Sequence, residues 1–228
     1  MASFVTRNAH RGGMLPLSVV AEVADHLGRG GLAVLPTETG YMLAARALDL
    51  GAVEKVFEAK ERDAADTIHV AFSDMSMVRR FAEVDSISAR ILGAFTPGPL
   101  TVVVRQRPSL PTGAVTVDGT VGVRVPEHPG TMQVISAVGA PLTATSLNLS
   151  GGPIVDPRDD VAMRSLKWRP SDSIFVVRDD RASEYSVPST LVRVIDGVIE
   201  VLRPGPIPEK DILVTARRIG YLDVDQWT

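Results

Sequence analysis

The sequence predicts an α/β fold, with one layered domain built on a mixed β-sheet. Segments rich in β-branched residues alternate with segments of helical apolar spacing over most of the 228 residues, and a hairpin pattern comes late in the chain. No internal repeat, low-complexity linker or shift in composition divides the chain. We therefore expect a flexible lead-in at 1–15, a single domain at 16–208, and a C-terminal helix and tail at 209–228 packed on that domain.

The expected helices are marked by apolar residues that recur every three or four positions. In the first of them Val20, Val23 and Leu27 share one face, and the pair Gly30 and Gly31 ends the helix. The same criteria place helices within residues 15–29, 49–62, 76–84, 86–95, 130–139 and 209–222.

The expected strands are short runs of valine, isoleucine, leucine and threonine bounded by glycine or proline. The segment 189–205 predicts a hairpin, because Asp196 and Gly197 are typical of a two-residue turn. About eight or nine strands are expected in total. Besides the hairpin, they fall within residues 32–36, 67–72, 100–105, 120–126, 141–152 and 173–179.

The composition excludes several kinds of site. The net charge is −3, so bulk positive charge does not hold nucleic acid, and an RNA contact would need a local patch. The absence of cysteine excludes disulfides and thiolate chemistry, and the four histidines follow no zinc pattern. No run approaches the roughly 18 consecutive apolar residues of a membrane span, and no signal-peptide pattern is present. We expect a soluble cytoplasmic protein.

The chain has neither a Walker loop nor a G-x-G-x-x-G pattern, so polar clusters at strand ends are the candidate ligand sites. Thr37 and Thr39 alternate along a segment expected to be extended, which would point both hydroxyls the same way. The alternative is that they only cap a strand end. Lys60 and Arg62 close an expected helix. They form either a solvated helix end, which the helix dipole favours, or a clamp for phosphate.

Two clusters contain arginine near a strand. Arg124 stands among valines, where an arginine is costly unless it meets a carboxylate, a ligand or a cavity. The expected hairpin opens with Ser189 and Thr190 and closes with Arg203, which by itself is only a hairpin with an arginine. Arg124 is thus a candidate for contact with a ligand or a carboxylate, whereas the hairpin cluster is weak evidence unless it is taken together with the others.

Ser146, Asn148 and Ser150 alternate at the end of an expected strand and are followed by two glycines. Three small hydrogen-bonding side chains on one face, next to bare backbone, are suited to a sugar or a phosphate. An ordinary turn rich in serine, asparagine and glycine is the alternative.

Taken in order, these clusters resemble the YrdC-type family, the L-threonylcarbamoyladenylate synthases, in their short single-domain form. The resemblance covers residues of about 16–208, as a YrdC-like domain. It rests on PTETGYML (36–43), KER (60–62), PGPLT (97–101), VGVRVP (121–126), SLNLSG (146–151), STL (189–191) and LRPG (202–205).

The resemblance implies a twisted mixed sheet, flanked by helices, with a large concave basic cavity. It also implies a nucleotidyltransferase reaction in which L-threonine, bicarbonate and ATP give threonylcarbamoyl-AMP and pyrophosphate. Mg²⁺ would arrive with the ATP, no cofactor would be tightly bound, and no protein nucleophile would be needed. A partner transferase would then modify the adenosine beside the anticodon of certain tRNAs.

The resemblance also implies roles for single residues. Lys60 and Arg62 would be catalytic, holding the ATP phosphates and neutralising charge as pyrophosphate leaves. The expected threonine contacts are Thr39, Arg124, the backbone of Ala144, Ser189 and His69. The expected nucleotide contacts, besides Lys60 and Arg62, are Asp66, Thr120, Ser146, Asn148, Ser150 and Arg203.

This chain departs from the family pattern around the same site. Met42 stands where the family has a glycine. A glycine there would let backbone or ligand approach closely, and a methionine side chain would not. Asp63 and Asp66 add acids near the proposed phosphate clamp and would repel ATP if they faced it. Ala71 stands where some members have a histidine that touches threonine. His69, two positions earlier on the same strand face, either reaches the cavity or is a strand histidine without a ligand.

Two other functions therefore stay open. A divergent member could adenylate another carbamoyl substrate, for example from carbamoyl phosphate. A module binding double-stranded RNA or tRNA is an alternative of another class, and its affinity would fall steeply with salt. The net charge of −3 speaks mildly against it.

Overall fold

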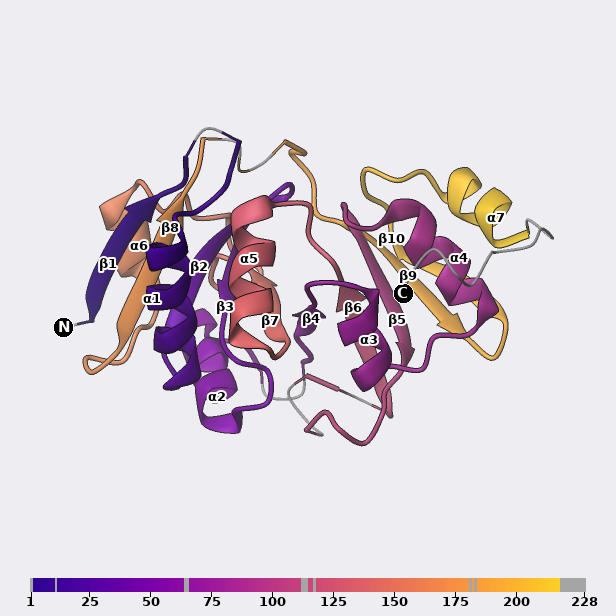
Figure 1. Cartoon of the computed structure of the whole chain (residues 1–228), viewed down its shortest axis with the longest axis horizontal. Helices are drawn as coiled ribbons and strands as arrows, with labels where there is room; N and C mark the ends of the chain where they lie inside the picture. Colours follow the sequence, from indigo (N-terminus) through magenta and orange to yellow (C-terminus); the bar gives the residue numbers. More distant parts are fainter. Residues whose placement is uncertain are drawn as a thin grey trace.

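The computed structural model describes residues 2–10, 12–63, 66–111, 115–116, 118–180, 182 and 184–217. Within them the strands form one ten-stranded sheet in the order β1-β8-β2-β3-β7-β4-β6-β5-β9-β10 (Figure 1). The strands are β1 (Ser3–Asn8), β2 (Leu32–Thr37), β3 (Gly40–Ala44), β4 (His69–Ala71), β5 (Leu100–Arg105), β6 (Thr120–Arg124), β7 (Leu142–Ser146), β8 (Ser173–Arg178), β9 (Thr190–Ile195) and β10 (Val198–Arg203).

The sheet is mixed, as the sequence predicts. β1, β8 and β2 run parallel to one another, as do β4 with β6 and β5 with β9. The other pairs are antiparallel. β2 and β3 are buried along their whole length, which explains their near-continuous apolar sequence.

The helices pack against this sheet. α1 and α5 lie side by side over β2, and α4 packs on β5 and on α7 (Figure 1). Aspartates accept backbone hydrogen bonds at the start of four helices and so define where each begins. The helices are α1 (Leu17–Gly28), α2 (Leu50–Lys60), α3 (Met75–Phe81), α4 (Ser86–Phe95), α5 (Pro129–Val138), α6 (Asp160–Ser165) and α7 (Glu209–Arg217).

Elements with strong local signals match their predictions closely. α4 and β5 have the predicted bounds, and the predicted hairpin is β9–β10. Its turn residues Asp196 and Gly197 both have positive φ, 51° and 78°, as the favoured two-residue hairpin turn requires. No helix in the described ranges is long and apolar enough to cross a membrane.

Where the sequence predicts a flexible lead-in, the structure has β1, which pairs with β8 along its whole length. Long-range contacts hold it: Phe4 packs edge-on against Trp168, with ring centroids 6.1 Å apart, and Arg7 pairs with Glu22 at 3.1 Å. A short run with half-buried polar residues carries little strand signal of its own, so the expectation of a lead-in was wrong. At the other end, the helix begins at Glu209, and residues 218–228 of the expected helix and tail lie outside the described residues.

The segment 36–43 is a tight hairpin and not one extended stretch. β2 ends at Thr37, Glu38 and Thr39 form the turn, and β3 returns antiparallel so that Gly40 lies opposite Thr37. Gly40 has a φ of 113°, which favours glycine at this reversal. The two threonine hydroxyls still converge, 3.4 Å apart, because the turn folds one over the other.

Candidate functional site

Three of the predicted arginines lie close enough to His69 for their positive charges to lower its pKa. His69 opens β4, pairs with Ala144 of β7, and lies with its ring against Gly122 of β6, where an added Cβ would come within 2.4 Å of His69 Cδ2. Burial, followed by the positive charges of Arg203, Arg124 and Arg62, lowers the pKa of His69 to about 4. These arginines come from β10, β6 and the end of α2, so the fold gathers them from distant parts of the sequence. We call His69, Arg62, Arg124 and Arg203 the arginine cluster.

Arg124 is held by the β2–β3 turn. Its Nη2 donates to Thr39 Oγ1 at 2.5 Å and to Glu38 Oε1 at 2.8 Å, with Thr37 Oγ1 further away at 3.4 Å. The side chain is only 11% exposed, and the buried Nε has no hydrogen-bond partner among the described residues. The prediction that this arginine needs a carboxylate or a cavity is thus confirmed for the carboxylate.

Glu38 is the carboxylate in question, and sequence reasoning missed it. Its side chain is 3% exposed, and its second oxygen accepts a hydrogen bond from the backbone N–H of Glu127 at 2.9 Å. A glutamate in a turn is ordinarily exposed, so its position gave no signal. The signal that could have found it is complementarity, because a buried arginine calls for a buried acid nearby.

Lys60 is not a solvated helix end. It is 1% exposed, and its Nζ donates to the carbonyl oxygen of Ser146 at 2.5 Å and to both the carbonyl oxygen and Oδ1 of Asn148 at 2.7 Å. Its own carbonyl oxygen accepts from the N–H of Ser150 at 2.8 Å. Burial, and then the charge of Arg62, lowers the pKa of Lys60 to about 8. Lys60 and the loop after β7 therefore form one unit.

The loop after β7 does not present its polar side chains on a single face. β7 ends at Ser146, so the alternation of a strand stops there. Ser146 and Ser150 are exposed, whereas Asn148 is buried, accepts from Ser146 Oγ at 2.7 Å and donates to the carbonyl oxygen of Gly152 at 2.8 Å. The single face of three hydrogen-bonding groups is therefore not formed, and the alternative, a turn rich in serine, asparagine and glycine, describes the loop.

Arg62 is held less fully than Lys60. Its Nη2 donates to the carbonyl oxygen of Thr67 at 2.8 Å, and its Nε lies 3.5 Å from Asp66 Oδ2. The Arg62 side chain is 25% exposed and that of Asp66 is 50% exposed. Asp66 therefore acts on Arg62 from a solvated position, where the ion pair is weakened by water.

Arg203 and Ser189 meet at the base of the β9–β10 hairpin. Arg203 donates to the carbonyl oxygen of Ser189 from Nη2 at 2.9 Å and from Nε at 3.2 Å. Ser189 is buried, and its Oγ is 2.8 Å from Thr101 Oγ1. Burial, and then the charge of Arg124, lowers the pKa of Arg203. Ser189 and Arg203 therefore lie together, and Arg203 is close enough to Arg124 for the charge of Arg124 to act on it.

Thr120 lies at the start of β6 and Arg124 at its end. Even-numbered positions of β6 share a face, so Thr120, Gly122 and Arg124 point to the side on which His69 lies. The four residue steps from Thr120 to Arg124 span about 13 Å, so a ligand must be about that long to contact both ends.

Three comparisons with known proteins bear on this site. A family model, Sua5_yciO_yrdC, described as "Telomere recombination", matches residues 25–205. The chain belongs to the Sua5/YciO/YrdC family. The family that the seven motifs predict is thereby confirmed, and the arginine cluster, Thr39, Ala144 and Ser189 all lie at positions of those motifs or close to them in space.

Individual relatives of this family show how far the likeness extends. A putative threonylcarbamoyl-AMP synthase of Methanocaldococcus jannaschii is 31% identical over 78% of this chain and 82% of its own length. The threonylcarbamoyl-AMP synthase of Bacillus subtilis is 32% identical over 91% of this chain but only 58% of its own length. The crystal structure of P. abyssi Sua5 complexed with L-threonine has a TM-score of 0.78 at 26% identity, covering 94% of this chain and 60% of that one.

The family departures have distinct places in the fold. Met42 is buried in β3 opposite Ser146, and Ala71 is buried in β4 opposite Arg124. Asp63 and Asp66 are both exposed. Among the described residues Asp66 forms an ion pair with Arg62 only, whereas His69 lies close enough to Arg203, Arg124 and Arg62 for all three charges to lower its pKa.

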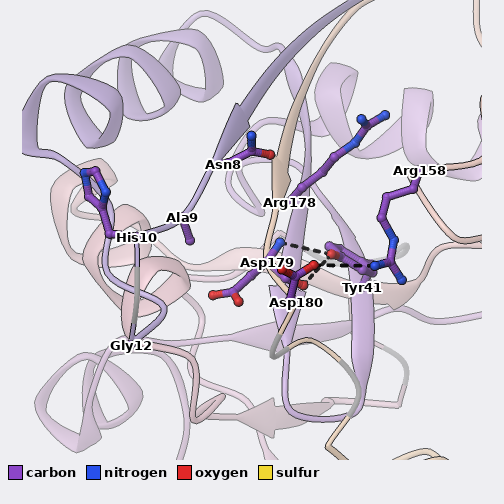
Figure 2. Close-up of a pocket in the computed structure, with 9 residues that line it drawn as sticks. All are labelled: Asn8, Ala9, His10, Gly12, Tyr41, Arg158, Arg178, Asp179 and Asp180. Atoms are coloured by element: carbon purple, nitrogen blue, oxygen red, sulfur yellow. Dashed lines mark hydrogen bonds and ion pairs between the residues drawn. The ribbon is translucent and has the colours of Figure 1, made fainter.

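A separate cavity of about 460 Å³ lies at the carboxyl ends of β1 and β8, and none of the predicted site residues lines it (Figure 2). The Tyr41 hydroxyl donates to the carbonyl oxygen of Asp179 at 2.9 Å and accepts from its N–H at 3.1 Å, and burial raises the pKa of Tyr41. Figure 2 shows Arg158 and Asp180 beside this tyrosine. The remaining lining residues are Asn8, Ala9, His10, Gly12, Arg178 and Asp179.

Proposed function

We propose that this protein is an ATP-dependent nucleotidyltransferase that forms L-threonylcarbamoyl-AMP and pyrophosphate from L-threonine, bicarbonate and ATP. The observation that carries the proposal is the arginine cluster, in which arginines from three of the motifs lie close enough to His69 to lower its pKa. The names of the relatives support the same reaction. The product would serve partner transferases that modify the adenosine beside the tRNA anticodon.

The charges of the reactants explain why arginines suit this reaction. Threonine carries a carboxylate, bicarbonate is an anion, and ATP carries several negative charges, so three anions must be brought together. Arginine keeps its charge when buried and offers donors in a fixed fork that matches carboxylate and phosphate oxygens. Aligning the reactants and stabilising the charge that develops on phosphate are the tasks that remain for the protein.

The residues divide into two groups in this proposal. Arg124 with Thr39, Ala144 and Ser189 takes the threonine side, since the unpartnered Nε of Arg124 can donate to a carboxylate. Arg62 and Arg203 take the ATP phosphates. Lys60 would act through the loop that it holds, so that the exposed Ser146 and Ser150 contact the nucleotide and the buried Asn148 fixes the shape of the loop.

We propose that Mg²⁺ enters with ATP and keeps most of its ligands from phosphate and water, as Mg²⁺ does in many nucleotide sites. We likewise propose that the arginine cluster lines the concave basic cavity expected from the family. A cytoplasmic location and direct contact with tRNA or double-stranded RNA stay predictions. Filter binding of tRNA across a salt series, without nucleotide, tests the RNA contact.

The direct test incubates the protein with ATP, Mg²⁺, bicarbonate and threonine and measures pyrophosphate together with the adenylate. We expect threonylcarbamoyl-AMP that depends on all three substrates. Absence of adenylate, under conditions in which the Bacillus subtilis relative produces it, would contradict the proposal. Parallel reactions with other amino acids and with carbamoyl phosphate decide whether this protein, with Met42 and Ala71 in place of the family's usual residues, uses a different small substrate.

A further inference from the structure

Glu38 joins three separate segments through its oxygen atoms. Oε1 accepts from Arg124 Nη2 at 2.8 Å, and Oε2 accepts from the N–H of Glu127 at 2.9 Å. Its carbonyl oxygen accepts from the N–H of Tyr185 at 2.9 Å. The β2–β3 turn is thus tied to the end of β6, to the loop that follows it, and to the segment that leads into β9.

Because Glu38 is buried, the loss of either contact of its carboxylate would be costly. A buried carboxylate is costly unless it is paired and hydrogen-bonded, and here each of its two oxygens has one strong donor. Arg124 is repelled by a like charge nearby. Arg203 lies close enough to it for the charge of Arg124 to lower the pKa of Arg203. Without an acid, that repulsion would push the Arg124 guanidinium away from the arginine cluster.

We propose that Glu38 is a positioning residue for the amino-acid substrate. Its carboxylate holds the Arg124 guanidinium beside Thr39, with the Nε–H left for the carboxylate of the substrate. Glu38 itself touches no substrate, and it acts through Arg124. The inference rests on the proposed function for its kinetic consequence, whereas the holding of Arg124 is a property of the protein alone.

Glu38→Gln tests the negative charge and the second acceptor oxygen of the side chain while its volume stays nearly the same. Glutamine has nearly the same volume but one acceptor oxygen in place of two, so its NH₂ group must face either Arg124 or the N–H of Glu127. One of the two contacts is lost, along with the negative charge. Glu38→Asp keeps the charge and both acceptors with a shorter reach, and Glu184→Gln makes the same chemical change at an exposed glutamate as a control.

We expect Glu38→Gln to raise the KM for threonine about 30-fold or more, the size of effect expected when one partner of a buried charge pair is lost. The KM for ATP and kcat should change less than about threefold, because Arg62 and Arg203 keep their contacts. Glu38→Asp should lie between Glu38→Gln and the unsubstituted protein, and Glu184→Gln should match the unsubstituted protein. Equal KM values for threonine in Glu38→Gln and in the unsubstituted protein would overturn the inference.

A double variant tests whether Glu38 works through Arg124. If it does, Arg124→Gln combined with Glu38→Gln should have the threonine KM of Arg124→Gln alone, within about threefold. Multiplied effects would show that Glu38 acts independently and would overturn the inference. If Glu38→Gln does not fold, Glu38→Asp carries the same test, and an unchanged threonine KM in that variant counts against it.

The holding of Arg124 can be measured without turnover. In ¹⁵N NMR of the arginine side chains, we expect resolved, slowly rotating Nη resonances for Arg124, assigned by their loss in Arg124→Gln. In Glu38→Gln the Arg124 side chain should rotate faster, so that its Nη resonances merge into one. In Glu184→Gln the Nη resonances should stay resolved. Unchanged resonances in Glu38→Gln overturn the positioning role whatever the turnover. Averaged resonances in a protein that makes no adenylate would support the positioning role and contradict the proposed function.

Discussion

Lys60 and Arg62 belong to one three-residue motif, yet the structure treats them differently. Lys60 is buried and uses its ammonium on three oxygens of the loop after β7, whereas Arg62 is partly exposed and has one firm acceptor. The cause is Glu61, which ends α2 in the left-handed conformation with φ 47° and ψ 42°. The reversal sends Lys60 into the protein and Arg62 toward the arginine cluster. Neighbouring cations in a motif therefore need not share a task.

The largest expected effect is that of Lys60→Met, which tests whether Lys60 holds the loop after β7. Methionine keeps the bulk of the side chain but removes the ammonium that donates to three oxygens of the loop after β7. We expect the free energy of unfolding to fall by roughly 3 kcal/mol or more, with loss of turnover, when measured by urea unfolding at neutral pH.

The matched control is Lys55→Met on the same helix. Lys55 Nζ donates to a single carbonyl oxygen, that of Gly30, at 2.8 Å. Its loss should cost about 1 kcal/mol. If Lys60→Met were no more destabilising than Lys55→Met, the view of Lys60 as the residue that holds the loop would be wrong.

Arg62→Ala should have the opposite profile. The ion pair with Asp66 is partly exposed, so the free energy of unfolding should change by less than about 1 kcal/mol. Adenylate formation should fall by about 100-fold or more, because a donor to the developing phosphate charge is removed. Normal turnover with a matched urea midpoint would refute the assignment of Arg62 to the phosphates, and Arg62→Lys shows how much of the effect needs the planar fork.

The smallest effect concerns the titration of His69. Arg62 contributes to its lowered pKa, so Arg62→Gln should raise that pKa, whereas Lys55→Met should leave it in place. ¹H–¹⁵N NMR of the imidazole through a pH titration measures it. A His69 pKa that does not move in Arg62→Gln would show that Arg62 lies outside the arginine cluster.

The same histidine makes stability depend on pH. Its pKa is about 4 in the folded protein, against 6.5 for an unperturbed histidine, so the unfolded chain binds more protons between these values. The contribution of His69 is fully present above pH 6.5 and is lost as the pH falls toward 4, at most about 3 kcal/mol. His69→Gln should make the free energy of unfolding, measured by urea unfolding at several pH values, depend less on pH between 4 and 6.5.

Much of the fold follows from local signals. The valine-rich runs, the aspartate caps and the Asp196–Gly197 turn each specify structure within a few residues, and α4 and β5 were predicted to the residue. β3 and β1 were missed for different reasons. β3 lies inside a motif whose alternating threonines predict one extended stretch, and β1 depends on β8 and Trp168, which are far away in sequence.

The site was predictable in its members but not in its contacts. The motifs that carry the family resemblance contain Arg62, Arg124 and Arg203, and in the structure the charges of all three lower the pKa of His69. Sequence spacing could not show that Lys60 is enclosed by Asn148, because that depends on the left-handed residue at Glu61. Nor could it show that Glu38 is buried, since its partner lies 86 residues away.

β1 has one more consequence, for how the protein behaves when shortened. It covers one side of β8, whose residues Ile174, Phe175, Val176 and Val177 are buried. A version trimmed to begin at residue 16, the predicted start of the domain, would leave β8 as an open, apolar sheet edge. Such an edge templates pairing between molecules. The N-terminal strand therefore protects the protein against aggregation as well as completing the sheet.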